Sequence, residues 1–160
     1  MFIKILAGVM LLISGMLTGT FLGNKYKKRR NFFNDFLSFS QALCTDITFL
    51  QKPLPQILNG FNCKSDFNRC LRDFGDNIEN PDDINLSVYN YLKQDEKNLL
   101  INFFCSLGKS DCETQLEIIN KSAAQAETIY KDCTAEQKKY VPLYAKLGFF
   151  AGAVIFIIIL

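Results

Sequence analysis

Hydrophobic segments at both ends are the feature that most constrains this chain of 160 residues. The first runs from Phe2 to Gly23 and is interrupted only by Lys4 and a few hydroxyl side chains. About 20 such residues form a helix that crosses the hydrocarbon core of a bilayer. The segment is long for the core of a cleaved signal peptide, and a basic block follows it directly. We therefore predict a retained transmembrane helix over residues 1–23, with a signal peptide as the alternative.

The second hydrophobic segment covers residues 142–160. Its uncharged part, Leu147 to Leu160, forms about 21 Å of helix, which is short for a bilayer. Counting from Val141 gives enough length, provided that Lys146 extends its amine toward the membrane surface. We predict a second transmembrane helix here, and a buried or interfacial helix is the alternative.

Basic residues flank both predicted spans on the side that faces the middle of the chain. Such residues favour the cytoplasmic side of a membrane. The pattern predicts a cytoplasmic domain over residues 24–141, with both termini outside. We interpret the flanking cations as topology anchors: Lys25, Lys27, Lys28, Arg29, Arg30 and Lys146.

Small residues four positions apart occur in both spans. Gly15, Gly19 and Gly23 lie in the first, and Gly148 and Gly152 lie in the second. This spacing lets helix backbones approach closely. We hypothesise that the spans pack on each other or on partner spans, although glycine is also frequent in membrane helices for other reasons.

Apolar residues in the middle of the chain recur every three or four positions, which predicts helices. The domain is expected to be all-α, an antiparallel bundle of about six helices with a phenylalanine-rich core. A capping box is expected to start the last helix, with Ser110 as the cap and Glu113 three residues on. The acidic stretch Gly75–Asp83 is expected to be a loop, and Pro142 is expected to kink or break the join to the second span. The expected helices are Asn31–Gln51, Leu54–Phe61, Asp66–Phe74, Ile84–Leu92, Asp95–Leu107 and Asp111–Tyr140.

Residues that carry chemistry are scarce. Histidine, the commonest general base and metal ligand, is absent, and no phosphate-binding loop or nucleophile motif is found. The six cysteines lack the C-x-x-C spacing of zinc sites, so we interpret them as small, half-buried apolar side chains. A net charge of +2 does not predict a nucleic-acid partner. We expect neither an enzyme nor a bound cofactor or metal.

Short motifs resemble those of one family. A Leu-Gly-x-x-Asp-x-x-x-Gln signature is matched by Leu107-Gly108-Lys109-Ser110-Asp111 with Gln115. The C-terminal segment is similar to a family terminus, with Lys146-Leu147-Gly148-Phe149-Phe150-Ala151-Gly152 before an aliphatic tail. Asp46-Ile47 and Pro53-Leu54 match a Glu-Ile, Pro-Leu pattern, with Asp46 in place of the usual Glu. Through these motifs the chain resembles the stage III sporulation protein AB family. The candidate motif or interface residues are Asp46, Pro53, Leu54, Gly108, Asp111 and Gln115.

The resemblance implies a role and partners. Proteins of this family are similar to the cytoplasmic domain of the inner-membrane platform protein of type II secretion machines. By resemblance, the chain is a mother-cell membrane component, facing the forespore, of the channel that endospore formation requires. Its expected partners are a secretion-type ATPase, other channel proteins and the membrane, and a homo-oligomer is left open.

Two alternatives stay open at this point. The motif residues around Gly108 can serve stability alone, because Gly108 ends one helix and Ser110 starts the next. The basic block beside the membrane can bind anionic lipid, which favours a membrane-anchored sensor or regulatory protein that binds lipid or a small ligand.

Overall fold

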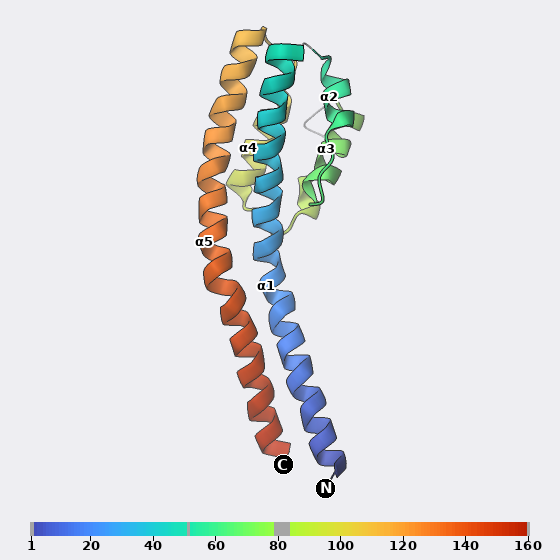
Figure 1. Cartoon of the computed structure of the whole chain (residues 1–160), viewed down its shortest axis with the longest axis vertical. Coiled ribbons are helices and arrows are strands. Elements are labelled where there is room, and N and C mark those ends of the chain that lie inside the picture. Colours follow the sequence, from blue (N-terminus) through green and yellow to red (C-terminus); the bar gives the residue numbers. More distant parts are fainter. Residues whose placement is uncertain (1, 51, 79–83, 160) are drawn as a thin grey trace. The chain divides into compact units, whose positions relative to one another are not determined.

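The computed structural model describes residues 2–50, 52–78 and 84–159, with residues 2–9, 11, 12, 16, 158 and 159 described by their backbone only. Every regular element in these ranges is a helix, which confirms the predicted all-α class (Figure 1). The chain divides into two compact units. Residues 1–27 and 132–160 form a two-helix unit, and residues 28–131 form a bundle unit.

Two long helices contribute to both units. Helix α1 spans Phe2–Thr45, and helix α5 spans Cys112–Ile159. The prediction that a separate helix starts at Asn31 is wrong, since the basic block before it is itself helical; Lys and Arg are good helix formers. A break at Pro142 is also wrong, because Pro142 lies inside α5, whereas the alternative of a kink there stays a prediction.

In the two-helix unit, α1 and α5 run antiparallel. Gly15 lies against Gly148 and Gly152, whereas Gly19 lies against Tyr144. A Cβ atom added at Gly15 would lie only 2.6 Å from the carbonyl oxygen of Gly148, so the two backbones are in direct contact. Only glycine permits this approach.

Helix α5 carries a segment long and apolar enough to cross a membrane, judged by length and composition. It is the one helix of this kind among the residues that the structure describes. Many side chains of the predicted first span, residues 1–23, lie outside the described residues. That span therefore stays a prediction.

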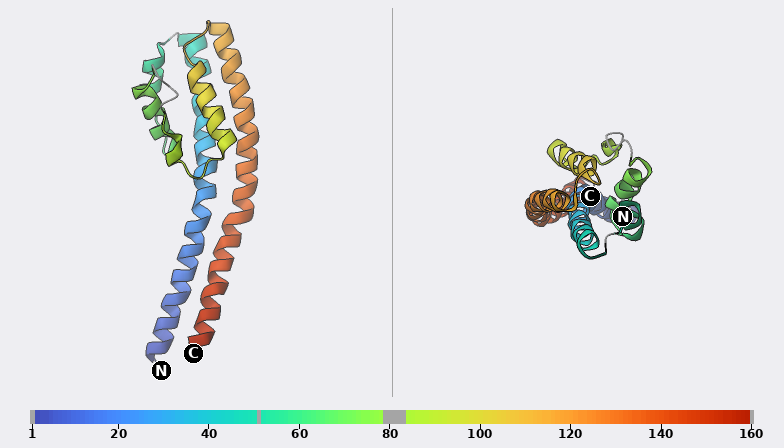
Figure 2. Two further views of the ribbon diagram at one scale, coloured as in Figure 1. Left: turned by 180° about the vertical axis from the view of Figure 1, so that it is seen from behind. Right: turned by 90° about the horizontal axis from the view of Figure 1, so that it is seen from above.

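The bundle unit is built around α1, whose aromatic face is buried by α2 (Leu54–Gly60), α3 (Phe67–Asp76), α4 (Gln94–Ser106) and the first turns of α5. In this unit α1 lies between α5 on one side and α2 and α3 on the other, as both side views show (Figures 1 and 2). Phe36 meets Phe103 with ring centroids 4.9 Å apart, and Phe74 stacks on Phe104 at 4.5 Å. The predicted phenylalanine core is thus present. Its largest fully buried side chains are Phe32, Phe33, Phe36, Phe39, Phe67, Phe74, Phe103, Phe104, Leu43, Leu71, Leu100 and Ile119.

The predicted helix over Ile84–Leu92 is wrong. The structure has a single 3₁₀ turn there, Leu86–Val88. The side chain of Asn85 accepts a hydrogen bond from the backbone N–H of Ser87 at 3.2 Å, which stabilises a turn in place of a helix. Most of the predicted acidic loop, residues 79–83, lies outside the described residues.

The end of the first predicted bundle helix differs from expectation as well. After Thr45 the chain forms a π-helical turn over Asp46–Leu50. A π turn holds one extra residue, so it rotates the following side chains away from the apolar face. Leu50 continues the three- and four-residue period of Phe39, Leu43 and Ile47, which predicts a core position, yet it is 55% exposed, and Phe49 is 78% exposed.

Candidate functional site

The motif residues that lie far apart in the sequence meet at one corner of the bundle unit. This corner comprises the π turn Asp46–Leu50, the start of α2 and the turn between α4 and α5. A pocket of about 180 Å³ opens there between Leu43, Leu54, Leu107 and Gln115. Among the predicted motif residues, Leu54, Gly108 and Gln115 line this pocket directly.

Gln115 stabilises the turn between α4 and α5 by hydrogen bonds. Its side chain is 5% exposed, and its Oε1 accepts a hydrogen bond from the backbone N–H of Gly108 at 2.9 Å. Its Nε2 donates to the carbonyl oxygen of Ser106 at 3.5 Å. Gly108 has φ +75°, which favours glycine, and a Cβ added there would lie 3.6 Å from Leu54 Cδ2. Gln115 and Gly108 therefore shape the turn and its contact with α2.

Asp111, and not Ser110, caps α5, so the predicted capping box is wrong. The Asp111 carboxylate accepts a hydrogen bond from the backbone N–H of Thr114 at 3.2 Å, and α5 begins at Cys112. Hydrogen bonds from the side chain and backbone of Thr114 lower the pKa of the Asp111 carboxyl. The motif aspartate thus fixes where α5 starts.

Asp46 starts the π turn of the corner, and Pro53 precedes α2. The Asp46 carboxylate pairs with Lys52 Nζ at 3.2 Å, across the turn that follows the π helix. The carbonyl oxygen of Pro53 accepts from the backbone N–H of Gln56 at 2.9 Å, so Pro53 opens α2. Between them, Phe49 projects a large apolar side chain into solvent.

This corner is suited to contact with another protein. Hydrogen bonds from Gln115 hold its interior, and its outer turn exposes two adjacent apolar side chains, Phe49 and Leu50. Among the described residues, no three His, Cys, Asp or Glu side chains gather into a group that could hold a metal ion. The outer turn of the corner therefore presents an exposed apolar surface.

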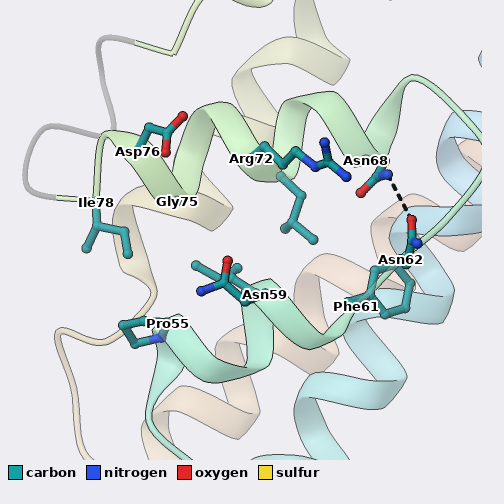
Figure 3. A pocket seen from close by; sticks show the side chains of 11 residues that line it. Pro55, Asn59, Phe61, Asn62, Asn68, Arg72, Gly75, Asp76 and Ile78 are labelled. Atoms are coloured by element: carbon teal, nitrogen blue, oxygen red, sulfur yellow. Dashed lines mark hydrogen bonds between the residues drawn. The ribbon is translucent and has the colours of Figure 1, made fainter.

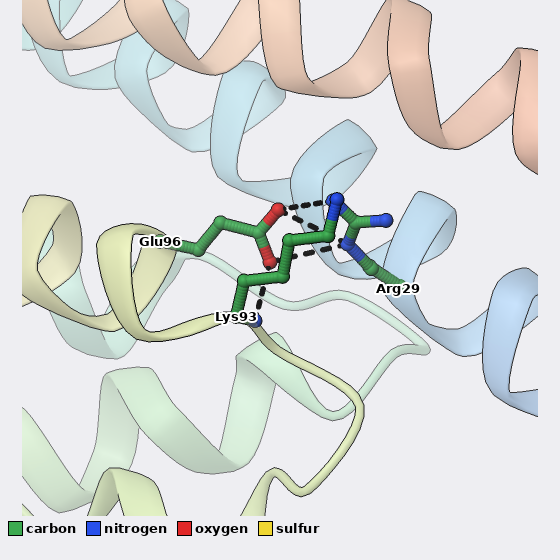
Figure 4. A network of polar contacts seen from close by, with 3 residues as sticks. All are labelled: Arg29, Lys93 and Glu96. Carbon is green, nitrogen blue, oxygen red and sulfur yellow. Dashed lines mark hydrogen bonds and ion pairs between the residues drawn. The ribbon is translucent and has the colours of Figure 1, made fainter.

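A buried ion pair joins α1 to α4 in the bundle unit (Figure 4). Arg29 is 5% exposed and Glu96 is 3% exposed. Arg29 Nε donates to the two carboxylate oxygens of Glu96 at 3.0 and 3.1 Å, and Arg29 Nη2 donates to Oε1 as well. Glu96 also accepts from the backbone N–H of Lys93 at 2.9 Å. Lys93 is the N-cap of α4, so the helix begins at Gln94, one residue before the predicted Asp95.

Sequence reasoning missed this pair, although a signal was present. Arg29 precedes Phe32 and Phe33 by three and four positions, and Glu96 precedes Leu100 by four. Both charges therefore lie on the apolar faces of their helices. Arg29, which we count among the topology anchors, is held inside the bundle, and Lys28 pairs with Asp66 at 3.6 Å.

The remaining predicted anchors lie elsewhere. Lys25, Lys27 and Lys146 are exposed and belong to the two-helix unit. Arg30 lies over the ring of Tyr130, 5.9 Å from its centroid, within the bundle unit. The structure thus divides the basic block between the two units.

A second pocket, of about 500 Å³, lies between α2 and α3 (Figure 3). Polar side chains reach it from both helices: Asn59 and Asn62 from α2 and the residues after it, and Asn68 and Arg72 from α3. Asn68 Nδ2 donates to Asn62 Oδ1 at 3.0 Å, so the two walls are linked at one end. Gly75 adjoins open space, because nothing lies within 4 Å of a Cβ added there.

None of the six cysteines forms a disulfide. Cys70 and Cys133 are buried, whereas Cys112 is exposed at the start of α5. Burial and the nearby Asp73 raise the pKa of Cys70 to about 12. The expected half-buried state is therefore found at Cys44, Cys63 and Cys105, and not at the other three cysteines.

Together, the fold and the site define a class: an all-helical bundle protein with a C-terminal helix able to cross a membrane and a motif-lined corner on the bundle. The chain belongs to the stage III sporulation protein AB family, whose model matches residues 4–160. Membership implies a role in sporulation and confirms the family that the motifs indicate. No curated protein and no solved structure matches the chain.

Proposed function

We propose that this protein is a non-catalytic platform in the channel between mother cell and forespore, and that the corner of its bundle unit docks a secretion-type ATPase. The observation that carries the proposal is the exposed pair Phe49 and Leu50 on the π turn. Large exposed apolar side chains on a rigid support mark protein interaction surfaces. The motif residues of the family hold that support in place.

The proposed topology places the bundle in the cytoplasm, both termini outside, and a transmembrane helix at each end. The antiparallel contact of Gly15 with Gly148 supports this arrangement, because two antiparallel spans bring both ends of a chain to one side of a membrane. Lys25, Lys27 and Lys146 are exposed and flank the proposed spans on the side that faces the middle of the sequence, where the positive-inside rule favours basic residues.

The test is to replace the exposed pair in the source organism. Phe49→Ser with Leu50→Ser is expected to leave the amount of protein unchanged, because exposed substitutions of this kind shift stability by no more than about 0.5 kcal/mol. Heat-resistant spore counts are expected to fall, with forespores that stall after engulfment. A matched control is Val88→Ser, which alters an apolar side chain of similar exposure, 53%, on another element of the bundle.

Two outcomes would contradict the proposal. A normal spore yield in the Phe49 and Leu50 variant would remove the corner as the docking surface. A normal yield after deletion of the whole chain would show that the role implied by the family does not apply here.

The pocket between α2 and α3 favours a second candidate, a membrane-anchored regulatory protein that binds a small polar ligand. Its volume falls within the range of ligand sites, and an arginine and three asparagines reach it. Gly75→Leu would fill open space there while improving helix propensity by roughly 1 kcal/mol. Loss of sporulation with a stable protein would support this candidate, and unchanged sporulation would count against it.

A further inference from the structure

Three tyrosines form a cluster in the two-helix unit. Tyr26 of α1 stacks on Tyr140 and Tyr144 of α5, with ring centroids 5.0 and 6.1 Å apart. Tyr140 and Tyr144 are one helical turn apart, so they share a face of α5. Tyrosine is enriched where membrane helices leave the hydrocarbon, because its ring is apolar and its hydroxyl is polar. In the proposed topology, the cluster therefore marks the level at which this unit meets the membrane surface.

Lysines from both helices lie at the same level. Lys25 Nζ is 5.1 Å from the ring centroid of Tyr26, and Lys139 Nζ is 5.3 Å from that of Tyr140. Cation–π contacts of this kind hold an amine in place while leaving it open to solvent. Neither amine is within ion-pair distance of a carboxylate among the described residues.

The charge of the two units differs in sign. The two-helix unit contains six lysines and two acidic residues, whereas the bundle unit contains 12 basic and 14 acidic residues. Five of the six lysines, all except Lys4, belong to the segments on either side of the tyrosine cluster. Positive charge is thus concentrated next to the membrane level.

An apolar track continues from the cluster into the span. Leu143 and Leu147 follow Tyr140 by three and seven positions, so they lie on the same stripe of α5. They are 43% and 54% exposed. If a ligand bound at Lys139 and Tyr140, its hydrocarbon chain would contact Leu143 and Leu147.

We propose that this collar, defined by Lys25 and Lys139 around Tyr26, Tyr140 and Tyr144, binds the phosphate headgroup of an anionic phospholipid. The two ammonium groups attract the phosphate, and the tyrosine hydroxyls donate hydrogen bonds to its oxygens. The acyl chains lie along Leu143 and Leu147. This site rests on the proposed topology but not on the ATPase-docking proposal, because it lies in the other unit of the chain.

The test uses the full chain in lipid nanodiscs made of equal parts of phosphatidylcholine and phosphatidylglycerol. Spin-labelled versions of each lipid report which one is held next to the protein. We expect phosphatidylglycerol to be preferred, and the preference to fall about fivefold for each lysine removed in Lys25→Gln and Lys139→Gln. High salt is expected to weaken the preference, because both amines are exposed.

Lys109→Gln with Lys121→Gln is the matched control, since it removes two exposed lysines of the bundle unit. The proposal is overturned if the two lipids are held equally, or if the control loses as much preference as the collar variant. Inorganic phosphate titrated into nanodiscs of phosphatidylcholine alone forms the third arm. Saturable phosphate binding that the collar variant loses would assign the site to free phosphate and overturn the lipid proposal.

Discussion

The buried pair of Arg29 and Glu96 allows a quantitative prediction. Both side chains are almost completely buried, and hydrogen bonds join them. Removing one partner leaves the other charge in the core without this counter-charge. We therefore expect Glu96→Leu and Arg29→Met to destabilise the bundle unit strongly, although neither changes the apolar core itself.

The magnitude follows from the geometry. Unit charges about 4 Å apart attract by roughly 4 kcal/mol at the effective dielectric constant of a protein site. Breaking a buried pair from one side costs about 3–5 kcal/mol. Glu96→Leu also removes the acceptor for the backbone N–H of Lys93, which adds about 1 kcal/mol. Glu96→Leu is thus expected to be the more damaging of the two single variants.

The double variant separates this explanation from a simple loss of packing. When both charges are replaced by apolar side chains, no buried charge remains, and such replacements are often neutral. The double variant should therefore be more stable than either single variant. Stability would be measured by denaturant unfolding of the full chain in detergent micelles, followed by circular dichroism.

Lys131→Ala is a control for this series, because it removes an ion pair with Glu127 that is largely exposed on α5. It should cause no measurable change. The reasoning would be refuted if the single variants resembled this control, or if the double variant lost as much stability as the two single variants combined.

Three further predictions concern other parts of the chain. Burial and a hydrogen bond to Asp66 raise the pKa of the Tyr91 phenol, so this phenol ionises at lower pH in the unfolded chain than in the folded one. Its contribution to stability is therefore complete below about pH 10 and falls as the pH rises above that value. Tyr91→Phe should flatten this fall in alkaline denaturation curves. In thiol labelling of the folded protein, the exposed Cys112 should react first. Cys70 should react only on unfolding, because its pKa of about 12 lowers its thiolate fraction about a thousandfold. Rapid labelling of all six thiols would contradict the fold. Gly148→Leu should separate α1 from α5 in the two-helix unit, because its side chain would overlap the facing backbone. Crosslinks between cysteines placed on the two helices are expected in the parent protein and should be lost in this variant.

Local patterns in the sequence were sufficient for the class of fold. Residues that recur every three or four positions predicted the all-α class, and the buried set Phe32, Phe36, Phe39 and Leu43 follows that period. Gly108 predicted the end of α4 because a left-handed residue there favours glycine. These features depend on neighbours within one helical turn, so they can be read without a structure.

The same patterns failed where two local signals competed. Residues 84–92 have a helical period, yet Asn85 and Ser87 stabilise a turn, and only Leu86–Val88 forms a short 3₁₀ turn. The π turn at Asp46–Leu50 also interrupts a regular period, and it moves Leu50 from the expected core to the surface. A period predicts a face only while the helix keeps one geometry.

The sequence by itself determined the hydrophobic ends, the helical class, the family and the identity of the motif residues. Only the tertiary structure decided what those residues do together: it brought Leu54, Gly108 and Gln115 to one pocket and placed the charges of Arg29 and Glu96 in the core. The physical reason is distance along the chain. Helical periodicity reports which face a residue occupies, whereas the partner on a distant helix depends on how the faces pack, which no local pattern specifies.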